Sequence, residues 1–172
     1  MANITSKYDL LTVIPTVQAT PDYATGDVLI APTEIYNFFK DKGSSAQIMS
    51  ICIIDKQGST HDFTLYFTHS STALGSLNAT AGAVIGVLEE IQATIPIVGA
   101  DWIAGGGAGS VDLANICTLT NPAVDGIGSI VKGANWANGN KTQSLYISAI
   151  AGEAMNIAST SDLIIKIGVK YW

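Results

Sequence analysis

The sequence predicts an all-β protein, an antiparallel β-sandwich or jelly roll with long loops and at most one short helix. Three observations lead to this prediction. Short apolar runs recur along the chain, turn-forming residues separate them at nearly regular spacing, and strands do not alternate with helical segments. No repeat of fixed period and no linker divides the chain, so we expect a single domain over 1–172 with a short N-terminal arm over about 1–7.

The strongest strand signals lie between Ala46 and His69, where two runs flank turn-forming residues at 55–58. In the second run three apolar residues alternate with polar ones, the period of a strand with one buried face: Phe63, Leu65 and Phe67. The first run is apolar on both faces, with Ile48, Cys52 and Ile54 on one side and Met49, Ile51 and Ile53 on the other. We therefore expect a hairpin whose first strand is central in its sheet and covered on both sides.

The other elements follow in order along the chain. Residues 8–19 alternate imperfectly, and Pro15 places this strand at a sheet edge or at a bulge. Residues 20–27 and 40–45 are turn-rich connections, 70–78 is a long polar loop, 80–88 has room for one or two helical turns, and 99–109 is a glycine-rich surface loop. Further strands are expected at 28–30, 34–39, 89–98, 111–119, 127–131, 144–150 and 162–169.

The expected core takes its side chains from the best-patterned strands. It comprises Ile48, Cys52, Ile54, Phe63, Leu65, Phe67, Leu145, Ile147, Leu163, Ile165 and Ile167. With 172 residues, 48% of them hydrophobic, the chain is large enough to bury such a core without disulfides.

Composition excludes several classes of partner. Only 13% of residues are charged, the net charge is −6, and all eight basic residues are lysines, so the chain lacks the arginines that phosphate-dense surfaces require and we expect no nucleic-acid partner. The most apolar window, 81–98, contains Glu89, Glu90 and Pro96, which predicts no membrane span. The first seven residues lack the pattern of a secretory signal, so we expect the protein to mature in a cytoplasm.

No motif indicates catalysis, a metal or a cofactor. The glycine run 105–109 has Ser110 where a dinucleotide fingerprint needs its third glycine. His61 and His69 lie roughly 26 Å apart at about 3.3 Å per strand residue, too far to share a metal, and we expect them at the surface or at the hairpin ends. Cys52 and Cys117 are expected to be buried thiols, with a disulfide as the alternative. We therefore expect a protein that is not an enzyme.

Several short segments together resemble the auxiliary head proteins of tailed bacteriophages, which decorate or cement the outside of the assembled capsid. The segments are 23–29, 55–56 leading to 62–67, 101–102, and 144–150 before a terminal apolar strand, and the resemblance spans about 8–169. It implies a jelly-roll or sandwich fold, no catalysis, assembly into homotrimers or similar clusters, and attachment to the major capsid protein. The virion would be assembled in the host cytoplasm and would carry this protein on its capsid surface.

An apolar β domain with scarce charge suits such contacts, and the aromatic and glycine-rich positions are the candidate interface: Trp102, Gly105, Gly106, Gly107, Trp136 and Trp172. Trp102 is expected either to anchor its loop to the core or a neighbouring subunit, or to form a platform for a sugar ring. The alternative function is a carbohydrate-binding sandwich for adhesion, in which Trp102, Trp136 and Tyr146 stack on sugars while Asp or Asn side chains bind hydroxyls or calcium.

Overall fold

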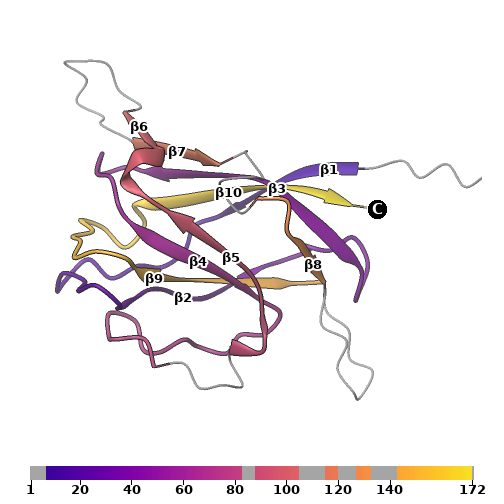
Figure 1. Cartoon of the computed structure of the whole chain (residues 1–172), viewed down its shortest axis with the longest axis horizontal. Helices are drawn as coiled ribbons and strands as arrows, with labels where there is room; N and C mark the ends of the chain where they lie inside the picture. Colours follow the sequence, from indigo (N-terminus) through magenta and orange to yellow (C-terminus); the bar gives the residue numbers. More distant parts are fainter. Residues whose placement is uncertain (1–6, 83–87, 105–114, 120–126, 133–142, 172) are drawn as a thin grey trace, which may run out of the picture.

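The described residues include ten strands, which form two antiparallel sheets that pack face to face (Figure 1). The computed structural model describes residues 7–82, 88–104, 115–119, 127–132 and 143–171. The first sheet, called the β3 sheet, has the order β1 (Lys7–Val13), β10 (Leu163–Tyr171), β3 (Ser45–Asp55), β7 (Asn115–Leu119) and β6 (Trp102–Ala104), and β8 (Ile130–Lys132) pairs with the first residues of β3. The second sheet, called the β4 sheet, has the order β2 (Val28–Ile35), β9 (Leu145–Ala151), β4 (Phe63–Thr68) and β5 (Ile91–Ile97).

The strand order is that of a jelly roll. The path β1–β10–β3–β7 faces the path β2–β9–β4–β5, so most connections carry the chain from one sheet to the other. β4 and β5 pair directly within one sheet, and the short β6 and β8 are additions to this eight-strand framework. The prediction of an all-β jelly roll is confirmed. Within the described residues, no helix is long and apolar enough to cross a membrane.

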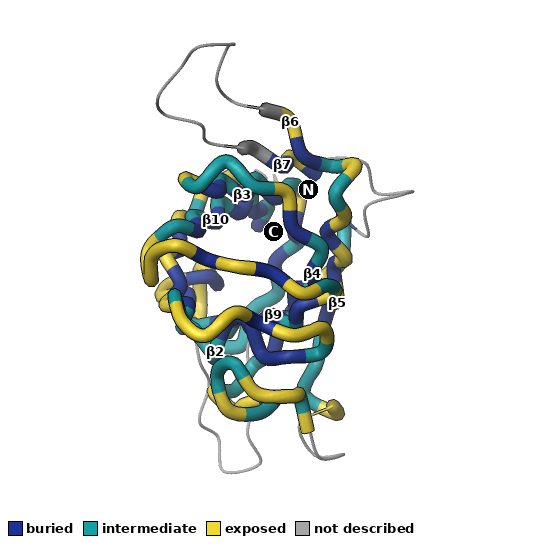
Figure 2. The backbone as a smooth tube through the Cα atoms, turned by 90° about the vertical axis from the view of Figure 1, so that its left-hand side faces the viewer, coloured by how far each residue is buried: buried dark blue, intermediate teal, exposed yellow. Residues whose placement is uncertain are grey.

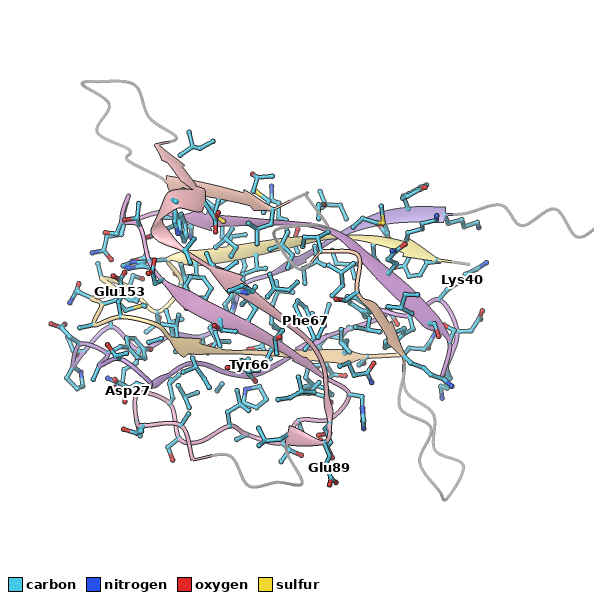
Figure 3. The ribbon with its side chains drawn as sticks, in the orientation of Figure 1. Asp27, Lys40, Tyr66, Phe67, Glu89 and Glu153 are labelled. Atoms are coloured by element: carbon cyan, nitrogen blue, oxygen red, sulfur yellow. The ribbon has the colours of Figure 1, made fainter. Side chains whose placement is uncertain are left out.

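The core lies between the sheets, where alternate side chains of each strand point inward. Phe63, Leu65 and Phe67 on β4 are at most 2% exposed, and Phe67 lies between the two layers in Figure 3. The predicted core is confirmed with two exceptions, Cys52 and Ile54. Both are only half-buried on the outer face of β3, whereas Ile51 and Ile53 are fully buried.

A β-bulge explains why the inward face of β3 was predicted incorrectly beyond Ile48. Val169 on β10 pairs with Ile48, but its neighbour Gly168 pairs with Ser50, so Met49 is an extra residue in the ladder. One extra residue reverses which side chains point inward after it. Consequently the buried positions are Ala46 and Ile48 before the bulge and Ile51, Ile53 and Asp55 after it.

The hairpin predicted between β3 and β4 is wrong, because the two strands belong to different sheets. A turn does form after β3, with the Gly58 amide donating to the carbonyl of Asp55 at 3.3 Å and Gly58 at φ 77°. The chain then continues over 59–62 and crosses the end of the sandwich. Both strands have one strongly apolar face, and placing them in opposite sheets lets the two faces bury each other.

Other boundaries also differ from prediction. β1 ends at Val13, before Pro15, and is an edge strand as expected. The strands expected at 28–30 and 34–39 are one strand that ends at Ile35, after which residues 36–39 turn so that both Phe38 and Phe39 are buried. The start of the expected 99–109 loop is a 3-10 turn over Gly99–Asp101 followed by β6. The helical turns expected over 80–88 lie mostly outside the described residues.

The bulge predicts different costs for two neighbouring isoleucines. Ile53→Ala empties a fully buried site and should lower the free energy of unfolding by about 2 to 5 kcal/mol. Ile54→Ala, at a half-buried position on the outer face, should cost clearly less. Urea unfolding of the two variants compares the same substitution on adjacent residues, and equal or reversed costs would contradict the bulged register.

Candidate functional site

Three connections meet at one end of the sandwich, which faces the viewer in Figure 2. They are 14–27 before β2, 56–62 between β3 and β4, and 152–162 before β10. The Tyr23 amide donates to the Met155 carbonyl at 2.9 Å, and the Ala158 amide donates to Oε1 of Gln57 at 2.8 Å. A Cβ on Gly152 would lie 3.0 Å from the Asp62 carbonyl oxygen, so glycine allows the loops to approach this closely.

Asp55 organises the 56–62 connection from inside the protein. Its side chain is fully buried at the end of β3, where the inward-facing register places it. Its Oδ1 accepts from the Gln57 amide at 2.8 Å and its Oδ2 from the Ser59 amide at 3.3 Å. Oδ2 also lies 3.2 Å from Nε2 of His61. A buried carboxylate is stable only with such partners, so the connection and Asp55 hold each other in place.

His61 lies between two carboxylates. Its side chain is nearly buried, which corrects the expectation of a surface histidine. Nε2 contacts Asp55 without hydrogen-bond geometry, and Nδ1 is 3.9 Å from Oε1 of Glu153. Because each ring nitrogen faces a carboxylate, neither is placed to take a proton from a serine or threonine hydroxyl. His61 therefore links Asp55 at the end of β3 to Glu153 in the 152–162 connection.

A polar hollow of about 470 Å³ opens at this end. Its walls come from the 56–62 and 152–162 connections, and its lining residues include Gln57, Ser59, Thr60, His61, Glu153 and Asn156. Glu153 also accepts from the Asp62 amide at 3.1 Å, so its carboxylate is already engaged in joining the loops. Within the described residues, no cluster of His, Cys, Asp and Glu has the arrangement of a metal site.

The structure describes only one of the candidate interface residues. Trp102 is 8% exposed, its indole Nε1 donates to the His61 carbonyl at 3.0 Å, and its ring packs at 6.4 Å from the ring of Phe63. This is the loop-anchoring role, and the buried ring offers no platform for a sugar. The other candidates lie outside the described residues: Gly105, Gly106, Gly107, Trp136 and Trp172.

The cysteines lie on opposite faces of the β3 sheet. Cys117 is buried and pairs with Ile53 in the ladder, whereas Cys52 pairs with Thr118 and is half-buried on the outer face. This placement does not fit the disulfide alternative, and it corrects the expectation that Cys52 is buried. The second histidine, His69, lies at the other end of β4, where Nδ1 is 2.9 Å from Nε2 of Gln92.

The two sheets differ in what covers their outer faces. Over the β4 sheet, the connection after β4 returns and buries Leu74 and Val28 in a second apolar cluster, supported by Tyr66, Ala81 and Ile150. The chain thus covers this face itself (Figure 1). Sequence reasoning missed this cluster because the region 70–78 is polar apart from isolated residues such as Leu74.

The outer face of the β3 sheet keeps its apolar side chains accessible. Ile54 pairs with Ile164, both half-buried, and Ile103 on β6 lies in register with them through β7 and is 70% exposed. Towards the other edge, Tyr8 and Leu10 on β1 are 67% and 58% exposed. In the described part of the chain, none of these five side chains belongs to a buried cluster. We call them the β3 outer face.

Comparisons with known proteins give distant structural likeness. No family model matches the sequence, and no curated protein matches it. A chain of the semi-empty virus-like particle of Macrobrachium rosenbergii nodavirus is 10% identical, with 99% of this chain and 96% of that chain covered and a TM-score of 0.30. A mud crab tombus-like virus chain is 9% identical, with 99% and 91% covered and a TM-score of 0.32. A Staphylococcus aureus CocE/NonD family hydrolase is 7% identical, with 98% and 37% covered and a TM-score of 0.34. The jelly-roll assignment itself rests on the strand order of this chain.

Removing the Asp55 carboxylate should destabilise the fold strongly. Asp55→Ala leaves two loop amides without their acceptor and His61 without its partner, and we expect a loss of about 3 kcal/mol in the free energy of unfolding. Asp162→Ala is the matched control, because Asp162 is half-buried and its Oδ2 accepts one loop amide, from Ser159 at 2.7 Å. A similar cost for both variants in urea unfolding would contradict the organising role of Asp55.

Tyr23 predicts a loss of stability in alkali. Burial raises the pKa of its phenol above the usual value; the hydrogen bond from the Gln18 amide opposes this shift, and the Asp27 carboxylate adds to it. Folding therefore favours the neutral phenol. The contribution of this group to the stability of the folded protein is complete below the unfolded pKa, near pH 10, and is lost as the pH rises through the folded pKa. Tyr23→Phe should make the alkaline fall in stability shallower, with part remaining because burial also raises the pKa of Tyr146 and Tyr171. An unchanged slope in urea unfolding between pH 8 and 11 would contradict this assignment.

Proposed function

We propose that the chain is a structural, non-catalytic virion protein that self-associates and binds the outside of a bacteriophage capsid as a decoration or cement protein. The observation that carries the proposal is the accessible, apolar β3 outer face. It supports a role in which the protein buries surface against other subunits. The resemblance of the sequence to auxiliary head proteins supplies the bacteriophage, the major capsid protein as partner and the homotrimer as the assembly.

The contrast between the two sheets is the first support. A sandwich has one interior, so each sheet has a second face that must be polar, covered by the chain or covered by a partner. The β4 sheet uses its own loop, through Leu74. Ile54, Ile103 and Ile164 on the β3 sheet are apolar, and in the part of the chain that the structure describes they belong to no such cluster. Contact with another subunit would give these residues the cover they lack.

The chemistry of the face also suits a lattice. Its five side chains are uncharged, and the neighbouring Lys166 and Lys170 on β10 point to the same side of the sheet, with Nζ of Lys170 6.0 Å from the centroid of the Tyr8 ring. An apolar face with few charges beside it makes a contact of modest strength. Several such contacts, made at once by a symmetric cluster on a repeating shell, add up to firm attachment.

The loop end supports a non-catalytic role for the same protein. His61 is held between Asp55 and Glu153, and these groups join loops to one another. Trp102, one of the three aromatic residues of the carbohydrate-binding alternative, is packed against Phe63 inside the fold. The described polar side chains at this end therefore act in holding the loops in place.

Capsid co-sedimentation tests the proposal. The purified chain should pellet with capsids of its own virus that lack it, and should stay in the supernatant with free nucleic acid. Ile103→Asp places a charge on the β3 outer face, which would have to lose its hydration in the contact. We expect capsid binding to weaken by about tenfold or more, a loss of at least about 1.4 kcal/mol of binding free energy.

Thr94→Asp is the control for that variant, because Thr94 is exposed on the outward side of β5 in the β4 sheet. It should bind as the unchanged protein does. Retention of the unchanged chain in the supernatant with capsids would overturn the proposal, and specific binding on a glycan array would then favour the carbohydrate-binding function. Equal weakening by both variants would show that the β3 outer face is not the contact.

A further inference from the structure

The edge strands of the two sheets are protected unequally. β2 contains Pro32 and two register shifts, β5 contains Pro96 and one register shift, and β6 comprises three of the described residues. Proline, irregularity and shortness are the features that stop an edge strand from pairing with another chain. β1 has seven residues, contains no proline and pairs with β10 in unbroken register from Lys7 to Val13. It is therefore the edge best suited to accept another strand.

The backbone of β1 shows which groups face outward. The Leu10 amide donates to Oδ1 of Asp9 at 2.8 Å, which indicates that this amide points away from β10. In an antiparallel strand the amides of alternate residues point to the same side, so Tyr8 and Thr12 also present backbone groups to the open edge. The short-range bond that Asp9 accepts satisfies one of these donors, since in the described part of the chain β1 pairs with no strand on this side.

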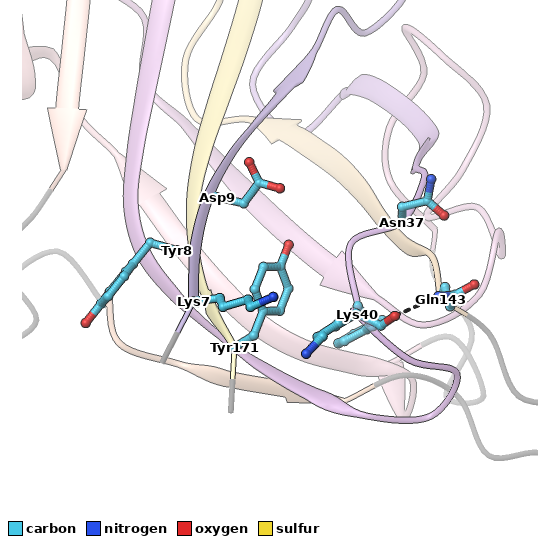
Figure 4. A pocket seen from close by; sticks show the side chains of 8 residues that line it. Lys7, Tyr8, Asp9, Asn37, Lys40, Gln143 and Tyr171 are labelled. Atoms are coloured by element: carbon cyan, nitrogen blue, oxygen red, sulfur yellow. Dashed lines mark hydrogen bonds between the residues drawn. The ribbon is translucent and has the colours of Figure 1, made fainter. Parts of the chain in front are cut away.

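The side of the sandwich along this edge is hollowed and carries several exposed apolar side chains. A hollow of about 250 Å³ lies between 11–14 and 33–36, and one of about 340 Å³ lies between the start of β1 and the turn after β2. In Figure 4, Lys7 and Lys40 point into the second hollow beside Tyr171, while Tyr8 points to the other side of β1. Four large apolar side chains along this side are more than half exposed: Tyr8, Leu10, Ile14 and Tyr36.

We propose that β1 is a strand-addition site for a second copy of this chain, with two β1 strands pairing antiparallel about a two-fold axis through Leu10. This inference rests on the proposed self-association and specifies one contact that produces it. The β3 sheets of two copies would join into one continuous sheet, and the backbone groups of Tyr8, Leu10 and Thr12 would pair with those of the partner. The Leu10 amide would then donate to the partner copy's Leu10 carbonyl in place of the Asp9 carboxylate.

The sequence of β1 is complementary to itself in this register. Leu10 faces Leu10 of the second copy, Tyr8 faces Thr12, and Asp9 faces Leu11. Lys7 faces Val13, so the two charged residues of the strand meet no like charge. An aromatic opposite a β-branched residue, with a leucine pair at the centre, is a favourable set of cross-strand neighbours. These matches favour a second copy of the chain over an unrelated strand.

Paired charge variants at Leu10 test the axis directly. Leu10→Lys and Leu10→Glu should each weaken self-association by about tenfold or more, because like charges then face each other at the centre of the contact. An equimolar mixture of the two variants should regain association, because only a two-fold contact places position 10 opposite itself. Sedimentation velocity over a micromolar concentration series measures all three samples.

Ile130→Lys is the matched control, because Ile130 on β8 is 62% exposed, close to the 58% of Leu10, and lies away from β1. It should associate as the unchanged chain does. The contact joins copies in pairs, so the unchanged chain should reach a dimer or an even-numbered assembly such as two joined trimers. A monomer or a lone trimer, an assembly insensitive to Leu10→Lys, or a mixture that does not regain association would each overturn the β1 site. Capsid binding by the unchanged chain would remain a separate test of the proposed function.

Discussion

The burial of one face of the β3 sheet against one face of the β4 sheet is the interaction on which the rest of this structure depends. It places Ile51 and Ile53 in the same interior as Phe63, Leu65 and Phe67, although β3 and β4 are consecutive strands with a turn between them. Packing the two sheets face to face buries the apolar side of β3 against the apolar side of β4. In a hairpin the two apolar sides would lie on the same sheet, and both would need another layer to bury them. The jelly-roll connectivity follows from this solution.

Facing packing also decides what remains outside. The β4 sheet has its outer face covered by the chain through Leu74 and Val28, while Ile54, Ile164 and Ile103 remain accessible on the β3 sheet. The unprotected edge of β1 belongs to this same sheet. The face proposed to contact a shell and the edge proposed to accept a second copy therefore belong to the same sheet.

The loop end shows how a crossing between sheets is stabilised. A connection that leaves β3 and enters β4 must expose backbone donors near the core, and the buried Asp55 carboxylate accepts two of them. His61 and Glu153 extend this network to the connection before β10, and Trp102 bonds to it from the start of β6. In the described part of the chain, Asp55, His61 and Glu153 thus hold the 56–62 and 152–162 connections together.

The fold class, the positions of the central and terminal strands and most of the core could be predicted from local sequence patterns. Phe63, Leu65 and Phe67 on β4 and Ile165 and Ile167 on β10 were predictable because each belongs to an unbroken period-two pattern. The edge position of β1 was also predicted, from Pro15 and its missing backbone donor, although the strand ends at Val13 before that residue.

Long-range packing sets the pairing of the strands, the inward face of β3 beyond Ile48 and the role of Asp55, and none of these was predictable from the sequence. A strand apolar on both faces carries no periodic signal, so the bulge at Met49 reversed its phase without a trace in the pattern. In the sequence, Asp55 and His61 have the pattern of ordinary turn residues. They become partners because connections distant in sequence bury them together. The sequence specifies which side chains leave water, but their neighbours are set by long-range packing that no local pattern records.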